Sequence, residues 1–259
     1  MKRDIQFQRW QFAQTAESSY WNSVISDPLE LLRITYEKVA AVQWASKALK
    51  DIFGDEQGTW VEIGIGPIGP IGIGCIHLFP KDITGNRQLL GVDPLSQMDF
   101  DKKKIPLPLQ ALIEACHTNK YSHLVNMGED IQINSGSSIF VACYNVLDHC
   151  YEPRKILSEI TRILKPGGYL LLGCDVYSWA GLMKYRLRNA LAAMRLINLK
   201  SIGDVAHPHQ FLARDLENLL RSFDLELIAI NRRNHEKVRR FWSHSYRMLI
   251  VARKQFSGE

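Results

Sequence analysis

The chain has 259 residues and a formal net charge of +5, with 46% hydrophobic and 23% charged residues. These proportions are typical of a globular protein and exclude a disordered, collagen-like or low-complexity chain. No apolar run approaches the roughly 18 residues of a membrane span, and the N-terminus lacks a signal-peptide core, so we expect a soluble, cytoplasmic protein. The small positive charge permits an anionic partner without indicating nucleic acid. The five cysteines form no C-x-x-C pair and are expected to be reduced, buried thiols.

Residues 1–56 carry apolar side chains at helical spacing, which predicts an N-terminal helical extension. After Gly58 the pattern changes to short apolar runs that end in Gly, Asn or Asp, with helical stretches such as 105–116 and 153–164 between several of them. Strands that alternate with helices predict a doubly wound α/β domain over residues 57–259. The predicted strands include 60–64, 89–93, 138–145, 169–175, 225–231 and 246–253.

Residues 176–203 interrupt this alternation. They contain five Lys or Arg residues and no acid, and their apolar spacing suits a helix. We therefore predict a helical insertion at 176–205, after the fifth strand, where it would cover the crevice beyond the carboxyl ends of the strands. Its basic residues favour an acidic or phosphorylated substrate, and the alternative is a solvated helix face. Its apolar side would suit a lipid-linked substrate, a peripheral membrane contact or a second subunit.

A glycine-rich loop follows the first predicted strand. Gly64-x-Gly66-x-x-Gly69 lets the backbone approach a ligand closely and fits the dinucleotide fingerprint, so an NAD(P)-dependent oxidoreductase is one alternative. Glu62 lies inside the strand before the loop, where a buried acid needs a partner such as an α-amino group or a loop amide. Asp93 ends the second strand, where a carboxylate can accept hydrogen bonds from ribose hydroxyls or cap the next turn.

Four short segments carry a family resemblance. They are E-I-G-I-G-P at 62–67, L-L-G-V-D at 89–93, N-V-L-D-H at 145–149 and E-I-T-R-I-L-K-P-G-G at 159–168. In this order and spacing they resemble the class I S-adenosylmethionine-dependent methyltransferases over about residues 58–175. The resemblance implies a Rossmann-like, mostly parallel seven-stranded sheet with an antiparallel last strand, and S-adenosylmethionine as the cofactor.

The resemblance also implies the residues that bind the cofactor. Glu62, Gly64 and Gly66 would hold its methionine end, and Asp93 its ribose. An acid after the third strand would lie near the adenine amino group; we favour Asp130, with Glu129 as the near alternative. The expected set is Glu62, Gly64, Gly66, Asp93, Glu129, Asp130 and Asn145.

The candidate chemical site follows the fourth strand. Asn145, Asp148 and His149 lie within five residues, and a His beside an Asp can act as a general base near neutral pH. The segment, together with His209, also resembles the metal-assisted branch of the family, in which a divalent ion such as Mg or Mn is bound. Asp148, His149 and His209 are thus candidate catalytic residues and candidate metal ligands. General base, metal ligation and structural hydrogen bonding all stay open.

These signals predict a methyltransferase that modifies a hydroxyl of a small-molecule or carbohydrate-like acceptor. RNA ribose 2′-O-methylation is an alternative, although the sequence shows no RNA-binding module and no interleaving of aromatic and basic residues. No Y-x-x-x-K follows a strand, which argues against one large family of oxidoreductases. Asp148 and His149 argue against a cofactor-binding subunit without activity. Tyr20 and Trp21 are interpreted either as a lid over the cofactor or as core residues.

Overall fold

The structure is a computed structural model, and everything said of it refers to the residues that it describes. These are 2–49, 58–66, 69, 71–74, 88–94, 107, 110–111, 121–193, 208–233 and 245–256. Several features of the sequence therefore lie outside the described residues: most of the predicted helix at 105–116, the loop positions 67–68, residues 194–205 of the insertion, and Cys75 and Cys116.

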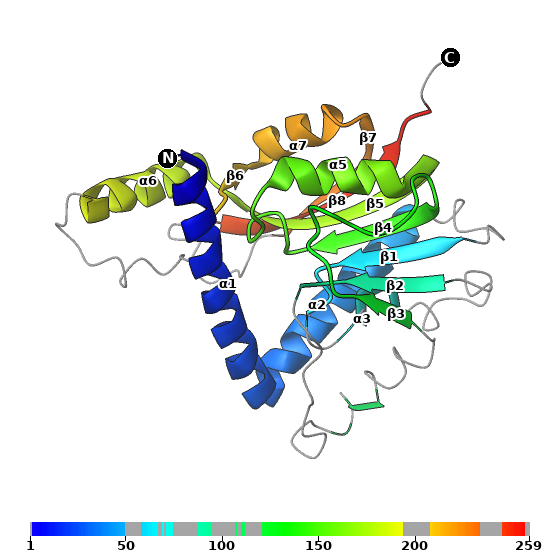
Figure 1. The fold of residues 1–259 in the computed structure, drawn as a ribbon, viewed down its shortest axis with the longest axis horizontal. Coiled ribbons are helices and arrows are strands. Elements are labelled where there is room, and N and C mark those ends of the chain that lie inside the picture. The colour runs from blue at the N-terminus through cyan, green and yellow to red at the C-terminus, as the bar shows by residue number, and fades with distance from the viewer. Residues whose placement is uncertain are drawn as a thin grey trace.

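One sheet of eight strands forms the centre of the described chain (Figure 1). Seven strands follow the order β3-β2-β1-β4-β5-β8-β7. Strands β1 to β5 are parallel to one another, and β8 is antiparallel to β5 and β7. This confirms the predicted mixed sheet. The strands are β1 (Thr59–Ile63), β2 (Gln88–Val92), β3 (Tyr121–Leu124), β4 (Ser138–Tyr144), β5 (Leu164–Tyr177), β6 (Phe211–Leu212), β7 (Leu225–Arg233) and β8 (Ser245–Lys254).

Strand β6 was not predicted. It has two residues, which pair with Val176 and Tyr177 of β5. A segment that short carries no periodic signal in the sequence. The predicted strands otherwise agree with the structure to within a few residues at each end, except that β5 begins at Leu164, immediately after the preceding helix.

Helices cover both faces of the sheet. The helices are α1 (Lys2–Ser26), α2 (Pro28–Ala48), α3 (Ile71–Gly74), α5 (Pro153–Ile163), α6 (Trp179–Ala193) and α7 (Ala213–Arg221). Helices α2 and α3 pack on one face, and α5 and α7 on the other (Figure 1). Helix α2 begins sharply because Pro28 is its first residue and the Asp27 carboxylate accepts hydrogen bonds from the amides of Leu29 and Glu30.

Alternation along β1 assigns its side chains to the two faces. Trp60 points to the face that α2 covers and stacks near Phe140, with ring centroids 4.6 Å apart. Val61 and Ile63 point to the opposite face, into the core shared with α5 and α7. Glu62 must therefore share the α2 face with Trp60. The predicted N-terminal extension is helical and contributes α2 to this core.

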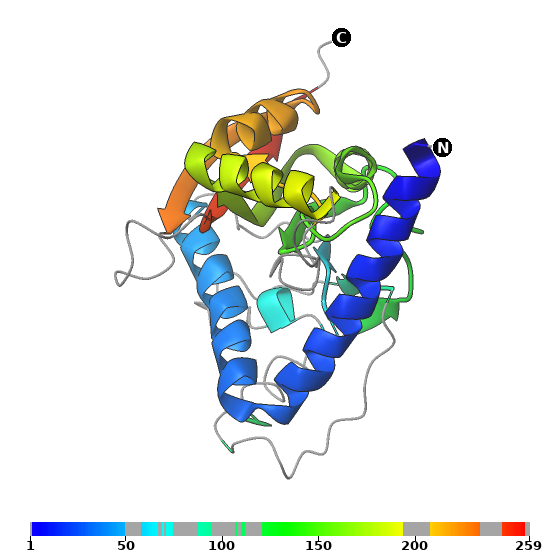
Figure 2. The same cartoon turned by 90° about the vertical axis from the view of Figure 1, so that its left-hand side faces the viewer.

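Helix α1 leaves α2 at a sharp angle. Figure 2 shows the two helices as the arms of a V, with α6 lying across the end far from the vertex. Trp21 and Val24 of α1 are buried in the same core as α2. The first two helices are thus part of the fold that surrounds the carboxyl ends of the strands.

Among the described residues, none of the helices combines the length and the apolar character that a membrane crossing requires.

We predict that Cys143, Cys150 and Cys174 resist thiol reagents in the native protein. All three are buried and free, which confirms the expectation for them, and burial raises the pKa of each thiol above its ordinary value. In a Cys75→Ser, Cys116→Ser background, native protein should react with a thiol-disulfide reagent at least about 100-fold more slowly than unfolded protein. A fast phase of one equivalent in the native protein would contradict this.

Candidate active site

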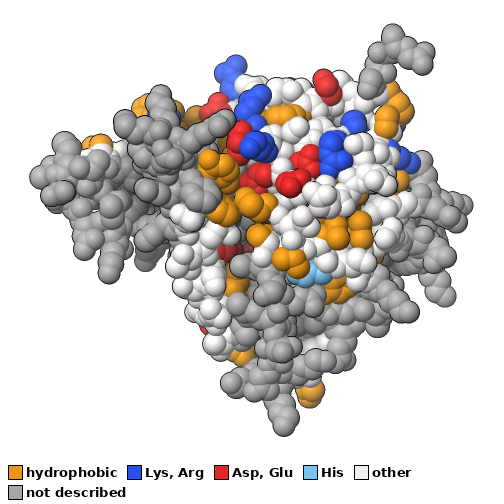
Figure 3. Space-filling model, in the orientation of Figure 1, with side chains coloured by type: hydrophobic (Ala, Val, Ile, Leu, Met, Phe, Trp, Pro, Cys, Tyr) orange, Lys and Arg blue, Asp and Glu red, His pale blue; other side chains and the backbone are white. Residues whose placement is uncertain are grey.

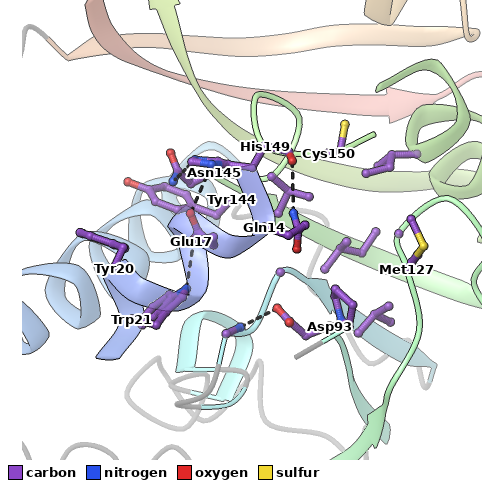
Figure 4. A pocket seen from close by; sticks show the side chains of 18 of the residues that line it. Gln14, Glu17, Tyr20, Trp21, Asp93, Met127, Tyr144, Asn145, His149 and Cys150 are labelled. Carbon is purple, nitrogen blue, oxygen red and sulfur yellow. Dashed lines mark hydrogen bonds and ion pairs between the residues drawn. The ribbon is translucent and has the colours of Figure 1, made fainter. Parts of the chain in front are cut away.

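A cavity opens at the carboxyl ends of the parallel strands. Gly64 and Gly66 follow β1, Asp93 follows β2, and Asn145 and His149 follow β4, and all five line the same cavity (Figure 4). Strands β1 and β4 are neighbours at the point where the strand order of the sheet reverses. Open α/β sheets bind their ligands at such a switch point.

The glycine loop after β1 has a backbone conformation and close contacts that only glycine allows. Gly64 and Gly66 have φ values of 77° and 64°, in the left-handed region. A Cβ at Gly64 would meet the side chain of Val146, and a Cβ at Gly66 would lie 2.8 Å from the ring of Trp21. The Gly66 amide donates a hydrogen bond to Asp93 Oδ2 at 2.8 Å, which ties the loop to the end of β2.

A buried ion pair lies beneath this loop. Lys38 of α2 places Nζ 3.1 Å from Glu62 Oε1 and donates to the carbonyl oxygen of Gly64 at 2.8 Å. The other carboxylate oxygen of Glu62 accepts a hydrogen bond from the Ile73 amide at 2.9 Å. Glu62 is thus buried beneath the loop and held by Lys38 and by the amide of Ile73 in α3, and its contact with the methionine end of the cofactor stays a prediction. Sequence reasoning missed Lys38.

The structure also reverses the preference between the two acids after β3. Asp130 is exposed, lies outside the cavity lining and accepts a hydrogen bond from Gln132. Glu129 lines the cavity, and its Oε1 accepts hydrogen bonds from the amides of Tyr151 and Glu152 at 2.9 and 3.1 Å. Glu129 therefore replaces Asp130 as the candidate at the adenine end. Asp93, 6% exposed, stays a candidate for the ribose.

His149 is held between helix α1 and the loop that follows β4. Its Nδ1 lies 3.3 Å from Glu17 Oε2 of α1, and its Nε2 lies 3.0 Å from the Asn145 side-chain nitrogen (Figure 4). The tautomer with a proton on Nδ1 satisfies both contacts, because Nδ1–H donates to the carboxylate and Nε2 accepts from the amide. Glu17 is itself oriented by Trp21, whose Nε1 donates to Glu17 Oε1 at 3.0 Å. Nε2 is then the nitrogen available to take a proton.

The other two candidate catalytic residues lie away from the cavity. Asp148 is 1% exposed and His209 is half-buried; neither lines the cavity. His209 Nε2 lies 2.9 Å from the Cys150 carbonyl oxygen, so this nitrogen donates and cannot offer its lone pair to a metal. Burial lowers the pKa of His209 below its ordinary value. The contact with Cys150 makes His209 a link between the loop before α7 and the loop after β4.

The expected metal triad does not form. Within the described residues, no three His, Cys, Asp or Glu side chains are grouped closely enough to hold a metal ion. Asp148 Oδ2 lies 3.7 Å from His149 Nε2, but His209 points to a backbone carbonyl. The described residues therefore do not fit a divalent ion at this place.

The cover of the cavity comes from the N-terminal helices. Its lining includes Trp10, Gln14, Glu17, Tyr20 and Trp21 of α1 and Arg33, Ile34, Glu37 and Lys38 of α2. The insertion was expected to cover the crevice, but none of its residues up to 193 lines the cavity, so this expectation is corrected for the described part.

Tyr20 and Trp21, interpreted from the sequence as either a lid or core residues, differ in their environments. Trp21 is 7% exposed and lines the cavity, so it is both core and cover. Tyr20 is more exposed and donates a hydrogen bond to Glu30 at 3.2 Å, which links α1 to α2. Burial, together with the Glu30 carboxylate, raises the pKa of Tyr20 to about 12, so its hydroxyl keeps the proton that it donates.

The end of the cavity near β8 is lined by the Tyr144 ring and by Arg247, whose positive charge is paired with a carboxylate. The Arg247 guanidinium lies 4.9 Å from the centre of the Tyr144 ring and is paired with Asp175. A Cβ at Gly173 would meet the Tyr144 ring, so glycine there gives this ring its place. Arg33, at the same cavity, is paired with Glu30 and Glu37.

Comparisons with known proteins agree with this architecture. A family model described as a methyltransferase domain matches residues 71–172. A thiol S-methyltransferase, TMT1B, of Rattus norvegicus is 31% identical over 111 residues, which are 42% of this chain and 43% of that protein.

Solved structures extend the comparison to the fold. An S-adenosylmethionine-dependent methyltransferase from Methanosarcina mazei has a TM-score of 0.53 and 18% identity, over 80% of this chain and 97% of that one. A geranyl diphosphate C-methyltransferase from Streptomyces coelicolor has a TM-score of 0.51 and 13% identity, over 82% and 79% of the two chains.

The sheet order is that of a Rossmann-like fold, and the glycine-lined cavity lies where such folds bind nucleotide-containing cofactors. In its fold, and over the segment matched by the methyltransferase-domain model, the chain is similar to the class I S-adenosylmethionine-dependent methyltransferases.

The cavity residues fit the cofactor of this family. The glycine loop leaves room for a close approach, and the Asp93 and Glu129 carboxylates lie where ribose and adenine donors are expected. Asn145 Oδ1 is buried and has no hydrogen-bond partner within the described residues, so it can accept a bond from a donor such as an amino group. Asn145 also has φ of 60°, the kind of backbone strain that is concentrated at functional sites.

We predict that Asp93→Ala weakens cofactor binding by about 1.5–3 kcal/mol, the range for losing hydrogen bonds to a charged acceptor. The variant loses the ribose acceptor and the bond from the Gly66 amide at 2.8 Å. Titration calorimetry with S-adenosylhomocysteine measures the change, and Asp130→Ala is the matched control because its carboxylate is exposed. Unchanged affinity in a folded Asp93→Ala protein would contradict the ribose role.

Proposed function

We propose that the protein transfers a methyl group from S-adenosylmethionine to a thiol or hydroxyl of a small acceptor, with His149 taking the proton of the acceptor. The observation that carries this proposal is the arrangement of His149, which lies at the cavity with Nδ1 near Glu17 and Nε2 near Asn145. The cofactor, when bound, supplies an electrophilic methyl group on a sulfonium centre.

The protein then has two tasks. It must hold the acceptor heteroatom in line with the methyl group, and it must remove the proton as the new bond forms. In the Nδ1-protonated tautomer, His149 Nε2 can take that proton after the acceptor displaces the Asn145 amide. The Glu17 carboxylate holds the Nδ1–H and stabilises the positive charge that develops on the ring.

A thiol is the first candidate acceptor. A free thiol has a pKa of about 8.5 and a free imidazole about 6.5, so an imidazole can generate the thiolate at modest energetic cost. The thiol S-methyltransferase of Rattus norvegicus, 31% identical over its matched part, supports the same choice.

A hydroxyl, the acceptor that the sequence led us to expect, is the second candidate. An alcohol is a far weaker acid than a thiol, so its methylation needs a base that is strengthened by a partner. The contact of 3.3 Å between Glu17 and His149 supports this candidate. The aromatic walls formed by Tyr20, Trp21 and Tyr144 would suit the apolar face of a ring, including that of a sugar.

An anionic acceptor and RNA receive less support. Arg33 and Arg247, the cavity arginines, are each paired with carboxylates, so little positive charge is left for a phosphate. Helices α1 and α2 cover the cavity, and this favours a small molecule over a polynucleotide. The family match favours S-adenosylmethionine over NAD(P).

A direct test measures S-adenosylhomocysteine formed in the presence of matched thiol and hydroxyl probes, such as thiophenol and phenol or mercaptoethanol and ethylene glycol. We expect turnover with at least one probe, unchanged by EDTA, and binding of S-adenosylhomocysteine but not NADH. Turnover with neither class, or tight binding of NADH alone, would overturn the proposal. Preference within each pair decides between the two acceptors.

We predict that Glu17→Gln lowers kcat by about 10- to 100-fold, because the ring of His149 loses the carboxylate that stabilises its charged form. Glutamine retains the oxygen that can accept from Trp21 Nε1, so the cover should stay in place. Steady-state kinetics should show the loss mainly in kcat. Glu30→Gln, which removes an exposed pairing on α2, should be mild. A wild-type kcat in Glu17→Gln would show that the pair is structural.

A further inference from the structure

Helix α6 exposes apolar side chains. Trp179 is 69% exposed and Leu187 is 61% exposed, Ala190 is also exposed, and Met183 is half-buried. At about 100° of rotation per residue, these four positions fall within a sector about 80° wide. Leu182, on another side of the helix, is buried. The helix therefore has an apolar face toward the protein and a second apolar face toward the outside.

The inner face shows that α6 is attached to the fold. Tyr185 lies beside Tyr177 of β5, with ring centroids 6.2 Å apart, and Leu182 is 6% exposed. Helix α6 is therefore packed on the domain through its inner face, and its outer apolar face is exposed in this packed position.

Basic residues border the exposed apolar face on both sides. At the same helical rotation, Lys184 falls about 60° beyond one edge of the sector and Arg186 about 20° beyond the other. Both side chains are exposed. No Asp or Glu occurs between residues 176 and 203. The face and its borders thus combine apolar side chains, a tryptophan and positive charge.

Helices α2, α5 and α7, as far as the structure describes them, lack this combination. The exposed apolar residues of α2, Leu29 and Tyr36, are interspersed with Glu30 and Glu37. Over α5 and α7, Lys and Arg side chains alternate with Asp and Glu side chains (Figure 3). The acid-free, tryptophan-bearing face therefore distinguishes α6 from these other helices.

We propose that α6 binds the surface of a membrane that contains anionic lipids. An interfacial helix buries an apolar face with Trp and Leu at the boundary of headgroups and acyl chains, and places Lys and Arg beside it against the lipid phosphates. Trp179 and Leu187 enter the interface, and Lys184 and Arg186 contact the headgroups. Charge complementarity selects an anionic lipid surface as the occupant.

Docking through α6 determines which edge of the protein meets the membrane. Helix α6 begins two residues after β5 ends at Tyr177, and β5 runs parallel to β4, whose carboxyl end carries Asn145 and His149. The lipid surface thus meets the edge of the sheet at which the cavity opens. This inference goes beyond the proposed methyl transfer, and lipid binding needs no turnover.

The test is co-sedimentation of the full chain with vesicles. We expect binding to vesicles of phosphatidylcholine with phosphatidylglycerol, weakened by salt, and little binding to phosphatidylcholine alone. Trp179→Ser should weaken binding about tenfold, and Lys184→Gln with Arg186→Gln about 25-fold, since each charge contributes about fivefold. The matched controls are Leu29→Ser on α2, where the exposed fraction is 76%, and Lys155→Gln on α5.

Three outcomes would overturn the proposal: no binding of the wild-type chain to anionic vesicles, equal binding to neutral and anionic vesicles, or wild-type binding by the Trp179→Ser and double variants. A change of solution mass in the α6 variants without any change in lipid binding would assign the face to a second copy of the chain and would also overturn it. Unchanged thermal unfolding and S-adenosylhomocysteine binding in each variant show that the fold and the cavity are intact.

Discussion

Replacing His149 by alanine should lower kcat by about 10²- to 10⁴-fold, the usual contribution of a positioned general base. The affinity for S-adenosylhomocysteine should change by less than about threefold, because Gly64, Gly66 and Asp93 are untouched. Rapid-quench measurement of methyl transfer separates the chemical step from binding. The loss should be largest with the acceptor of weaker acidity, since a thiol can ionise without help.

His209→Gln is the matched control for this experiment. His209 lies outside the cavity lining and contacts the Cys150 carbonyl oxygen, and glutamine can donate a hydrogen bond in its place. A mild effect is expected, and added Mg or Mn should rescue neither variant. If His149→Ala retains full activity with every acceptor, positioning alone accounts for catalysis.

Lys38→Met should destabilise the protein by about 3–5 kcal/mol, the cost of leaving one charge of a buried pair without its partner. The side chains of Lys38 and Glu62 are both at least nine-tenths buried. Lys38 Nζ also donates a hydrogen bond to the carbonyl oxygen of Gly64. Urea denaturation measures the free energy of unfolding. Lys47→Met, on the exposed side of the same helix, is the control and should change it by less than about 0.5 kcal/mol.

A second variant separates charge from packing at this position. Lys38→Met with Glu62→Gln removes both charges, so it should recover part of the stability lost in Lys38→Met. A Lys38→Met protein within about 1 kcal/mol of wild type would show that the ion pair is not a main support of the glycine loop.

Local patterns in the sequence predicted the sheet well, and they singled out Gly64, Gly66 and Asp93, which line the cavity. Strand alternation, the glycine loop and Asp93 each depend on residues close together in the chain, so periodicity and turn chemistry identify them. Spacing favoured Asp130, whereas Glu129 lines the cavity, because neighbouring residues in a turn point in different directions and spacing does not determine which one faces inward.

The contacts that complete the site are long-range. Gln14 reaches the carbonyl of His149 across 135 residues, and Lys38 reaches Glu62 across 24. Nothing local indicates that α1 folds back over the carboxyl ends of the strands, so the sequence suggested the insertion as the cover. Glu17 and Lys38 become visible as site residues once the packing of α1 and α2 is known.

Two parts of the chain line the cavity: the edge of the sheet and the N-terminal helices α1 and α2. The match to the methyltransferase-domain model begins at residue 71 and includes β2, β3 and β4, whereas β1 and the glycine loop precede it. Helices α1 and α2 end before that point, yet they supply Glu17, Trp21 and Arg33 to the lining. Substitutions in these helices can therefore reshape the acceptor side while the strands that hold the cofactor stay as they are. We therefore expect substitutions at Glu17, Trp21 or Arg33 to change which acceptors the cavity takes.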